Sequence, residues 1–256
     1  MITAGIDVGI ENIKAVIVKD GKVIARGTAP SGGQGRAKAV EELYAKVLKG
    51  AKLGPSDVSK VVATGLGKWD AQFAQARVVE PVADAKAAAF LKPSARAVID
   101  LGADQARAVQ YDDQGKIKQY TLNHKCAAGI GLFLESMSLT LGMSLEEMGQ
   151  VAPASDGLVV NDQCAALAEL DVVAMVHNNV PKTKIVQAVN EAVATKLCAM
   201  LNEMLNPIEG EAVLIGGVAA NASLTKAFKK HLGINFVIPE QPEYAGALGA
   251  ALIAAG

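Results

Sequence analysis

Aromatic residues make up only 4% of this 256-residue sequence, although hydrophobic residues as a whole make up 51%. The scarcity of large rings argues against an aromatic-rich β-sandwich. The abundance of small residues, alanine and glycine above all, suits helices that pack closely on sheets. We therefore expect an α/β fold, in a chain long enough for one large domain or two modest ones.

An excess of charge and a long apolar run are also missing. Twenty-five basic residues face 26 acidic ones, for a net charge of −1, so the sequence lacks the basic surface that binding to nucleic acid requires. No apolar stretch reaches the length of a membrane span, and the first residues lack the basic and apolar regions of a secretion signal. We expect a cytoplasmic protein that binds neither nucleic acid nor membrane.

Cysteine is scarce, and the three cysteines are Cys126, Cys164 and Cys198. An odd number without a secretion signal argues against a disulfide framework. Cys126 and Cys164 follow polar residues and precede helical patterns, where a helix dipole favours the thiolate. They are either buried small side chains or metal ligands, and their polar neighbours favour ligands. Cys198 lies in the apolar stripe of a helix expected at residues 182–205, which indicates packing.

Two thiolates per chain cannot complete a 4Fe-4S cluster, which needs four. A symmetric or pseudo-symmetric dimer would supply the other two. We therefore expect any such cluster to lie between two subunits.

The sequence contains an internal repeat of three strands. Residues 2–8, 13–18 and 22–27 read as strands, with an Asp-Gly hairpin turn before the third. Residues 95–101, 106–111 and 116–122 repeat the order, and an Asp-x-Gly element ends the first strand of each set. We predict a domain of residues 1–92 plus a C-terminal helix at 242–256, and a second domain of residues 93–241.

The repeat predicts a nucleotide site between the two halves. Gly9 and Gly102 let the chain turn with amide groups toward a common cleft, where they can hold phosphate oxygens. Asp7 and Asp100 can hold a hydrated Mg²⁺ beside those oxygens. A glycine pair at 216–217 ends another buried strand and permits close approach of adenine or ribose. Two strands that hold Asp and Gly by chance are the alternative, and the matching strand order argues against it.

At this point the sequence resembles the BadF/BadG/BcrA/BcrD ATPase family over essentially its whole length. The motifs that carry the resemblance are Gly5-Ile6-Asp7-Val8-Gly9 with Lys14, Thr64-Gly65-Leu66-Gly67, Asp100-Leu101-Gly102, Lys125-Cys126-Ala127-Ala128-Gly129-Ile130-Gly131, Cys164-Ala165 with Glu169, and Gly216-Gly217-Val218-Ala219-Ala220-Asn221. The resemblance implies an actin-like, Hsp70-like or sugar-kinase-like fold of duplicated ribonuclease H-like domains.

The resemblance also implies the roles of individual residues. Asp7 and Asp100 would be catalytic with Mg²⁺, and Cys126 and Cys164 would ligate a 4Fe-4S cluster shared between two subunits. The residues implied to bind ATP are Gly5, Gly9, Lys14, Gly102, Gly216, Gly217 and Asn221.

The family includes activators of 2-hydroxyacyl-CoA dehydratases and ATP-binding subunits of benzoyl-CoA reductase, so the implied function is ATP-driven transfer of low-potential electrons. Three departures from the activator pattern favour the delta-type subunit of benzoyl-CoA reductase, paired with a related alpha-type subunit: residues 10–13, residues 102–105 and Asp84. A homodimeric dehydratase activator is the first alternative; a small-molecule kinase and a non-catalytic scaffold are the others. The implied partners are CoA-ester reductase or dehydratase subunits and a low-potential ferredoxin or flavodoxin.

Overall fold

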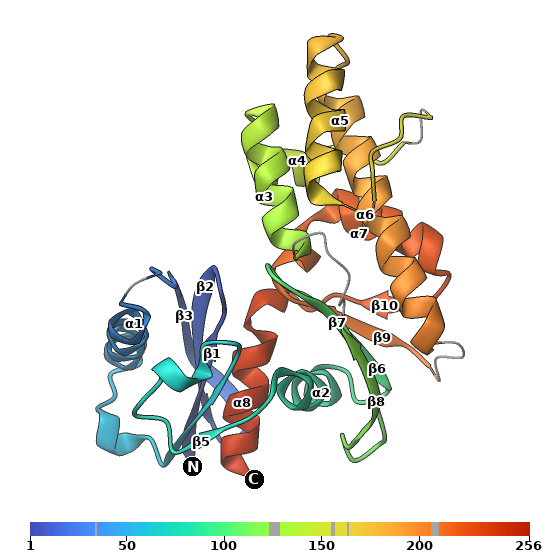
Figure 1. The fold of residues 1–256 in the computed structure, drawn as a ribbon. Coiled ribbons are helices and arrows are strands. Elements are labelled where there is room, and N and C mark those ends of the chain that lie inside the picture. The colour runs from blue at the N-terminus through green and yellow to red at the C-terminus, as the bar shows by residue number, and fades with distance from the viewer. Residues whose placement is uncertain (34, 123–128, 155–156, 163, 206–209) are drawn as a thin grey trace.

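The computed structural model describes residues 1–33, 35–122, 129–154, 157–162, 164–205 and 210–256. It contains two five-stranded sheets, each flanked by helices (Figure 1). The first sheet consists of β1 (Ile2–Val8), β2 (Asn12–Lys19), β3 (Lys22–Pro30), β4 (Lys60–Thr64) and β5 (Ala76–Arg77). The second consists of β6 (Ala97–Leu101), β7 (Ala106–Tyr111), β8 (Ile117–Leu122), β9 (Ala212–Ile215) and β10 (Phe236–Val237).

The two sheets have the same topology. The first runs in the order β3-β2-β1-β4-β5, and the second reads β8-β7-β6-β9-β10 in the same direction. Each begins with an antiparallel meander, and each adds two parallel strands beside the first strand. The repeated strand order predicted from the sequence is confirmed. In the first hairpin, Asp20 and Gly21 both have positive φ angles, 49° and 76°, as the Asp-Gly signal predicts.

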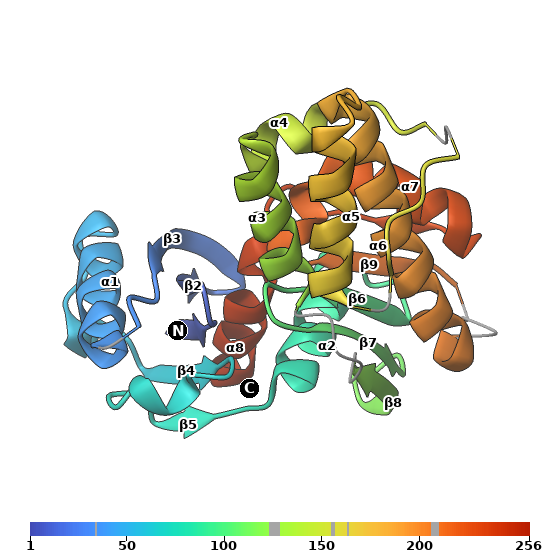
Figure 2. The same ribbon diagram turned by 45° about the horizontal axis from the view of Figure 1, so that its top comes forward.

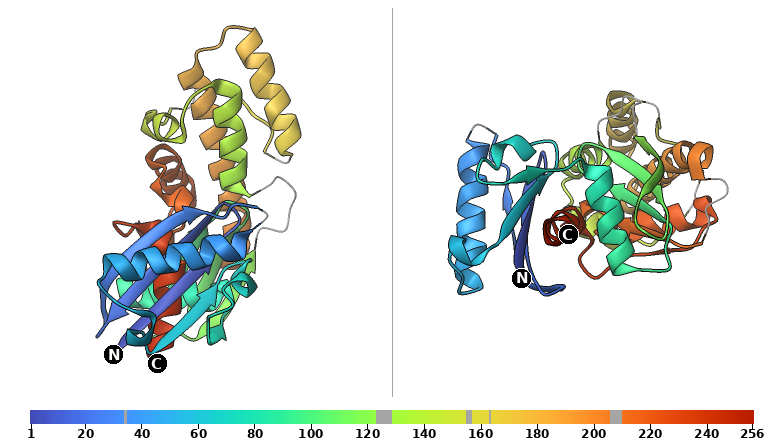
Figure 3. Two further views of the ribbon diagram at one scale, coloured as in Figure 1. Left: turned by 90° about the vertical axis from the view of Figure 1, so that its left-hand side faces the viewer. Right: turned by 90° about the horizontal axis from the view of Figure 1, so that it is seen from below.

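Helix α1 (Arg36–Gly50) covers one face of the first sheet, and its buried residues, Val40, Leu43 and Val47 among them, recur at helical spacing. The other face is covered by α8 (Ala245–Ala255), which is almost entirely small and apolar. Seen from below in Figure 3, α8 and α2 (Glu80–Leu91) lie between the two sheets. This placement explains why both helices lack a polar face.

Gly5 and Gly249 allow this close packing. A side chain at Gly5 would approach the Ala247 carbonyl oxygen of α8 to 1.9 Å, and one at Gly249 would approach the Ala83 carbonyl oxygen of α2 to the same distance. Only glycine fits at either contact. Gly5, which we predicted to bind the nucleotide, therefore has a packing role in the middle of β1.

The second sheet carries further helices on its other face (Figures 1 and 2). They are α3 (Ile130–Leu141), α4 (Leu145–Gln150), α5 (Ala165–His177), α6 (Lys182–Leu205) and α7 (Ala222–Leu232). Short 3₁₀ turns lie at Pro55–Asp57, Lys68–Asp70, Gly217–Ala220 and Pro242–Tyr244. The largest apolar cluster joins these helices to the sheet through residues such as Leu134, Met137 and Phe228.

The division into domains stays a prediction. The C-terminal helix α8 packs on the first sheet, whereas α2 packs on β6, β7 and β8 of the second. Helix α2 also packs along α8, so it lies between the two halves and packing alone does not assign it to either. In the described part of the chain, no helix is long and apolar enough to cross a membrane.

Candidate functional site

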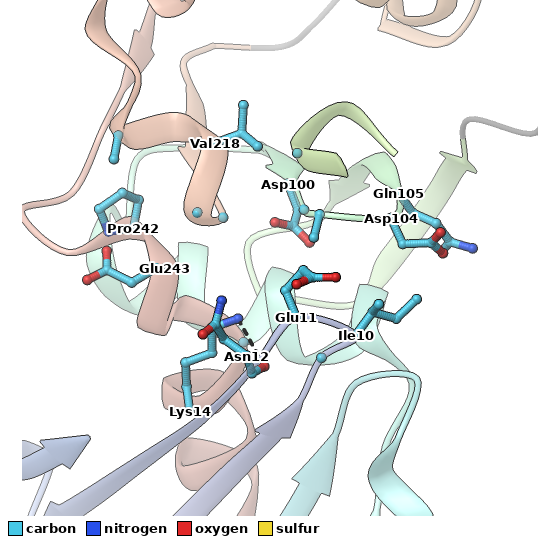
Figure 4. A pocket seen from close by; sticks show the side chains of 18 of the residues that line it. Ile10, Glu11, Asn12, Lys14, Asp100, Asp104, Gln105, Val218, Pro242 and Glu243 are labelled. Atoms are coloured by element: carbon cyan, nitrogen blue, oxygen red, sulfur yellow. Dashed lines mark hydrogen bonds between the residues drawn. The ribbon is translucent and has the colours of Figure 1, made fainter. Parts of the chain in front are cut away.

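A cleft of about 710 Å³ opens between the two halves of the molecule. Its walls come from the turns after β1 and β6, the start of α2, and the segment that follows β9. Figure 4 shows Lys14 and Asn12 of the first half facing Asp100 of the second, with Val218, Pro242 and Glu243 on one side and Asp104 and Gln105 on the other.

The first hairpin places Asp7 and Lys14 together at the bottom of the cleft. They are directly paired across β1 and β2, and the Lys14 Nζ lies 4.0 Å from the Asp7 Oδ2. Burial raises the pKa of Asp7, and the Lys14 ammonium offsets part of that rise. The Gly9 amide donates to the Asn12 carbonyl at 3.1 Å. Because this amide closes the turn itself, it is not available to a phosphate.

The second hairpin repeats this geometry with a different cation. Asp100 is directly paired with Arg107, and the Gly102 amide donates to the Gln105 carbonyl at 2.9 Å. The Arg107 Nη2 donates to Asp100 Oδ2 at 2.5 Å, and its Nε donates to Asp84 Oδ2 at 2.9 Å. Arg107 thus bridges two carboxylates, Asp100 and Asp84, whereas Lys14 faces Asp7 alone.

Asp84 is the most deeply buried member of this network, with only 2% of its surface exposed. Burial raises the pKa of Asp84 well above 3.8, while Arg107 acts in the opposite sense. Burial by itself lowers the pKa of Arg107, but the carboxylates of Asp100 and Asp84 outweigh it, so the net shift is upward. Asp84, noted from the sequence only as a departure, is therefore part of the cleft floor.

Arg107 was missed from the sequence, although a signal was present. It follows Asp100 by seven residues, the spacing that separates Asp7 from Lys14. Aligning the two halves of the repeat would have placed it opposite the second aspartate.

A glycine of positive φ lies beside each aspartate. Gly65 follows β4 with φ 89°, and Gly216 follows β9 with φ 91°. A side chain at Gly65 would approach Asp7 Oδ1 to 2.6 Å, and one at Gly216 would approach Asp100 Oδ1 to 2.3 Å. The repeat therefore includes this glycine, which keeps both carboxylates accessible.

The wall formed by the segment after β9 is suited to the flat part of a nucleotide. Gly216, Gly217 and Asn221 all line the cleft, together with Gly149 of α4. The Asn221 side-chain oxygen accepts a hydrogen bond from the Leu224 amide at 3.0 Å, so this residue also caps α7. Helix α4 was not predicted, although Ser144 and Glu147 form a capping box at its start.

The turn from Gly102 to Gln105 contacts α3, the helix that follows the first cysteine motif. The Gly131 amide of α3 donates to the Gly102 carbonyl at 3.3 Å, and the Leu132 amide donates to the Ala103 carbonyl at 3.1 Å. A side chain at Gly131 would approach the Ala103 Cα to 2.7 Å. Cys126, just before this helix, lies outside the described residues.

Cys164 is the half-buried N-cap residue of α5, and its side chain makes no capping hydrogen bond. Its amide donates to Asn161 Oδ1 at 2.8 Å. Helices α3 and α5 lie side by side with their N-termini at the same end (Figures 1 and 2). The Cys164 thiol therefore lies at the N-terminus of α5, beside the N-terminus of α3.

Cys198 has a different environment. It is 5% exposed within the largest apolar cluster, and burial raises its pKa to about 12. Such a thiol stays protonated and unsuited to metal binding, which agrees with the packing role that we expected. Within the described ranges, no three His, Cys, Asp or Glu residues are grouped so as to hold a metal ion.

The sequence is similar to proteins of known activity along its whole length. It is 38% identical to the activator of lactoyl-CoA dehydratase from Anaerotignum propionicum, covering 99% of this chain and 97% of that protein. It is 34% identical to the D chain of benzoyl-CoA reductase from Thauera aromatica, covering 98% and 92%.

Solved structures extend the similarity to the fold. The activator of 2-hydroxyisocaproyl-CoA dehydratase from Clostridium difficile, solved with bound ADPNP, has a TM-score of 0.91 and 30% identity, covering 99% of this chain and 94% of that one. Sugar kinases with lower identity share the fold alone. The fold is therefore the actin-like, sugar-kinase-like ATPase fold, as predicted. The model of the BadF/BadG/BcrA/BcrD ATPase family matches residues 4–254, and this chain belongs to that family.

Proposed function

We propose that this chain is an ATP-hydrolysing activator that passes low-potential electrons to a dehydratase of the 2-hydroxyacyl-CoA class. The assignment to a benzoyl-CoA reductase, which we preferred from the sequence, has weaker support, because the similarity to a dehydratase activator is higher. One departure that favoured the reductase also has a local explanation. Asp84 is paired with Arg107 inside the cleft, so its identity need not depend on the electron acceptor.

The observation that carries the proposal is the contact between α3 and the turn from Gly102 to Gln105, which we propose binds phosphate. Two backbone hydrogen bonds join Gly102 and Ala103 to the first residues of that helix. The N-terminus of α5, where Cys164 lies, is at the same end. A movement of the turn around a nucleotide would therefore shift α3 and so reach the Cys164 thiol, which we call the thiol site.

The residues of the cleft fit a magnesium-bound nucleotide. Asp7 is a carboxylate bordered by glycines, and Lys14 beside it can neutralise phosphate charge. Asp100 also faces the cleft, with one oxygen held by Arg107. We propose Asp7 and Asp100 as the residues that position the magnesium and the attacking water, and the segment from Gly216 to Asn221 as the base and ribose wall.

Cys164 and Cys126 are the proposed cluster ligands. Two copies of the chain would supply the four thiolates that a 4Fe-4S cluster requires, so we propose a homodimer with the cluster at its interface. When bound, the cluster would accept an electron from a reduced ferredoxin or flavodoxin and release it to the dehydratase. The protein's part is to hold the thiolates at two helix N-termini and to couple their spacing to the nucleotide cleft.

Anaerobic reconstitution with iron and sulfide tests this proposal. The wild-type protein should form a brown homodimer with about four iron atoms per dimer and an EPR signal after reduction. Cys164→Ser and Cys126→Ser should each lose iron and signal. Cys198→Ser is the matched control and should retain both, because that thiol is buried away from the helix N-termini.

A cluster signal of normal intensity in Cys164→Ser would contradict the ligand assignment. A wild-type protein that assembles a cluster only with a different chain would favour the reductase-type heterodimer. A cluster-loaded protein that does not hydrolyse ATP would favour a non-catalytic scaffold.

A further inference from the structure

A buried hydroxyl without a partner lies in the floor of the cleft. Thr64, the last residue of β4, is 1% exposed, and its Oγ1 makes no hydrogen bond. Among the described residues, the other buried side-chain atoms of this kind belong to Tyr111, Asn190 and Gln241, none of which lines the cleft. An unpaired buried hydroxyl lowers stability, so its presence at a binding site points to a ligand.

The position of Thr64 relates it directly to Asp7. The two residues are paired in register across the parallel strands β1 and β4, so their side chains lie on the same face of the sheet. Glycines border both oxygens of Asp7, with Gly65 beside Oδ1 and Gly246 beside Oδ2. The carboxylate and the hydroxyl therefore share one uncrowded end of the cleft.

The second half of the molecule has no equivalent pair. The residue at the corresponding position of β9 is Ile215, a buried alkyl side chain in register with Asp100. One oxygen of Asp100 is already bound by Arg107. Among the described residues, a carboxylate that is not hydrogen-bonded to an arginine and a hydroxyl without a partner thus occur together only in the first half.

We propose that the Thr64 hydroxyl, together with the Asp7 carboxylate, holds a water molecule of the hydrated magnesium ion that accompanies the nucleotide. This inference rests on the proposed function. Magnesium keeps several of its waters when it binds to proteins with phosphates. A threonine hydroxyl can accept a hydrogen bond from such a water and donate another hydrogen bond to a phosphate oxygen. Thr64 is then a positioning residue that acts through the magnesium.

Thr64→Val tests the inference, since valine preserves the shape and removes the hydroxyl. ADPNP affinity is measured by calorimetry with and without Mg²⁺, alongside the Mg²⁺ dependence of ATP hydrolysis and the melting temperature without nucleotide. The ratio of the ADPNP affinity with Mg²⁺ to that without Mg²⁺ should fall by about tenfold. A loss of this size corresponds to one hydrogen bond to a charged group. The melting temperature should not fall, because the hydroxyl has no partner to lose.

Two further variants separate this role from a structural one. Thr64→Ser should restore the Mg²⁺ dependence, because serine keeps the hydroxyl. Thr3→Val removes a buried hydroxyl from the same face of the same sheet, where it donates to the Ala251 carbonyl at 2.9 Å. That variant should melt at a lower temperature and keep the wild-type response to Mg²⁺.

A Thr64→Val protein with the wild-type magnesium dependence would overturn the inference, as would a Thr64→Ser protein that behaves like Thr64→Val. A wild-type protein that binds ADPNP with magnesium but does not hydrolyse ATP would instead contradict the proposed function. The binding measurement would still decide the role of Thr64.

Discussion

Gly216 and Gly217 are neighbours in the sequence but differ in their surroundings. Gly216 has a φ of 91°, and a side chain there would approach Asp100 Oδ1 to 2.3 Å. A side chain at Gly217 would meet no atom within 4 Å. In the sequence the two glycines form one motif. In the structure Gly216 packs against Asp100, whereas Gly217 has open space around it.

Gly216→Ala should therefore lower the free energy of unfolding by about 2 kcal/mol or more, because backbone strain and the contact with Asp100 add. Gly217→Ala is the matched control, and its free energy of unfolding should stay within about 0.5 kcal/mol of wild type. Urea unfolding without nucleotide measures both. Equal stability of the two variants would show that Gly216 does not approach Asp100 as described.

The sequence could predict that a residue lies in the cleft where that residue belongs to a recognisable motif. Asp7, Asp100 and Gly216 stand out because each ends an apolar strand. Gly5 belongs to the same motif, but its neighbours on α8 lie more than 240 positions away in the chain, and no local pattern reveals them. Arg107 is the opposite case, since only comparison of the two halves would have identified it.

Among the elements, α2 was the one that sequence patterns missed most completely. Four of its five alanines, Ala83, Ala85, Ala87 and Ala88, are buried and lie on more than one side of the helix, so no single apolar stripe forms. The strands were predicted from their apolar runs and the turn residues between them, even where a strand such as β6 is buried throughout. Periodicity therefore fails where an element is enclosed, and α2 carries the buried Asp84 at such a place.

The buried carboxyl of Asp84 in α2 predicts a pH effect on stability. Since burial raises the pKa of Asp84 well above 3.8, the folded protein holds this proton more tightly than the unfolded chain. The resulting stabilisation is complete below pH 3.8 and is lost as the pH rises toward the folded-state pKa.

Asp84→Asn cannot titrate, so its free energy of unfolding should fall less than that of wild type as the pH rises above 3.8. Urea unfolding at a series of pH values measures the difference. Asp113→Asn, at an exposed turn carboxylate, is the control and should follow the wild-type curve. The same pH dependence in Asp84→Asn and wild type would mean that Asp84 stays charged in the fold.

At the scale of the whole molecule, the two halves share the topology of their sheets but differ in the number of helices that they carry. The overall topology was predictable because the strand order and the Asp-x-Gly elements repeat visibly. The helices α3 to α7 are added only to the second half. How they lie relative to the cleft depends on long-range packing and could not be derived from local patterns.

The contact between α3 and the turn from Gly102 to Gln105 predicts that the proposed nucleotide site and the proposed cluster site at Cys164 are coupled through Gly131. A side chain there would approach the Ala103 Cα to 2.7 Å, so Gly131→Ala should push α3 away from the turn. The variant should still bind nucleotide at the proposed site, which includes the first hairpin and Gly216–Gly217, but the bound nucleotide should no longer alter the proposed cluster. We expect ADPNP to change the rate of iron release to a chelator in wild-type protein and to leave it unchanged in Gly131→Ala.

The control for this experiment is Gly50→Ala, at a helical glycine with open space around it. It should respond to ADPNP like wild type and be stabilised by up to about 1 kcal/mol, because alanine favours a helix more than glycine does. Iron release must be compared at saturating ADPNP, so that weaker binding is not mistaken for lost coupling. If Gly131→Ala then responds to nucleotide as strongly as wild type, the signal reaches the thiol site by a route other than the Gly102–Ala103 turn.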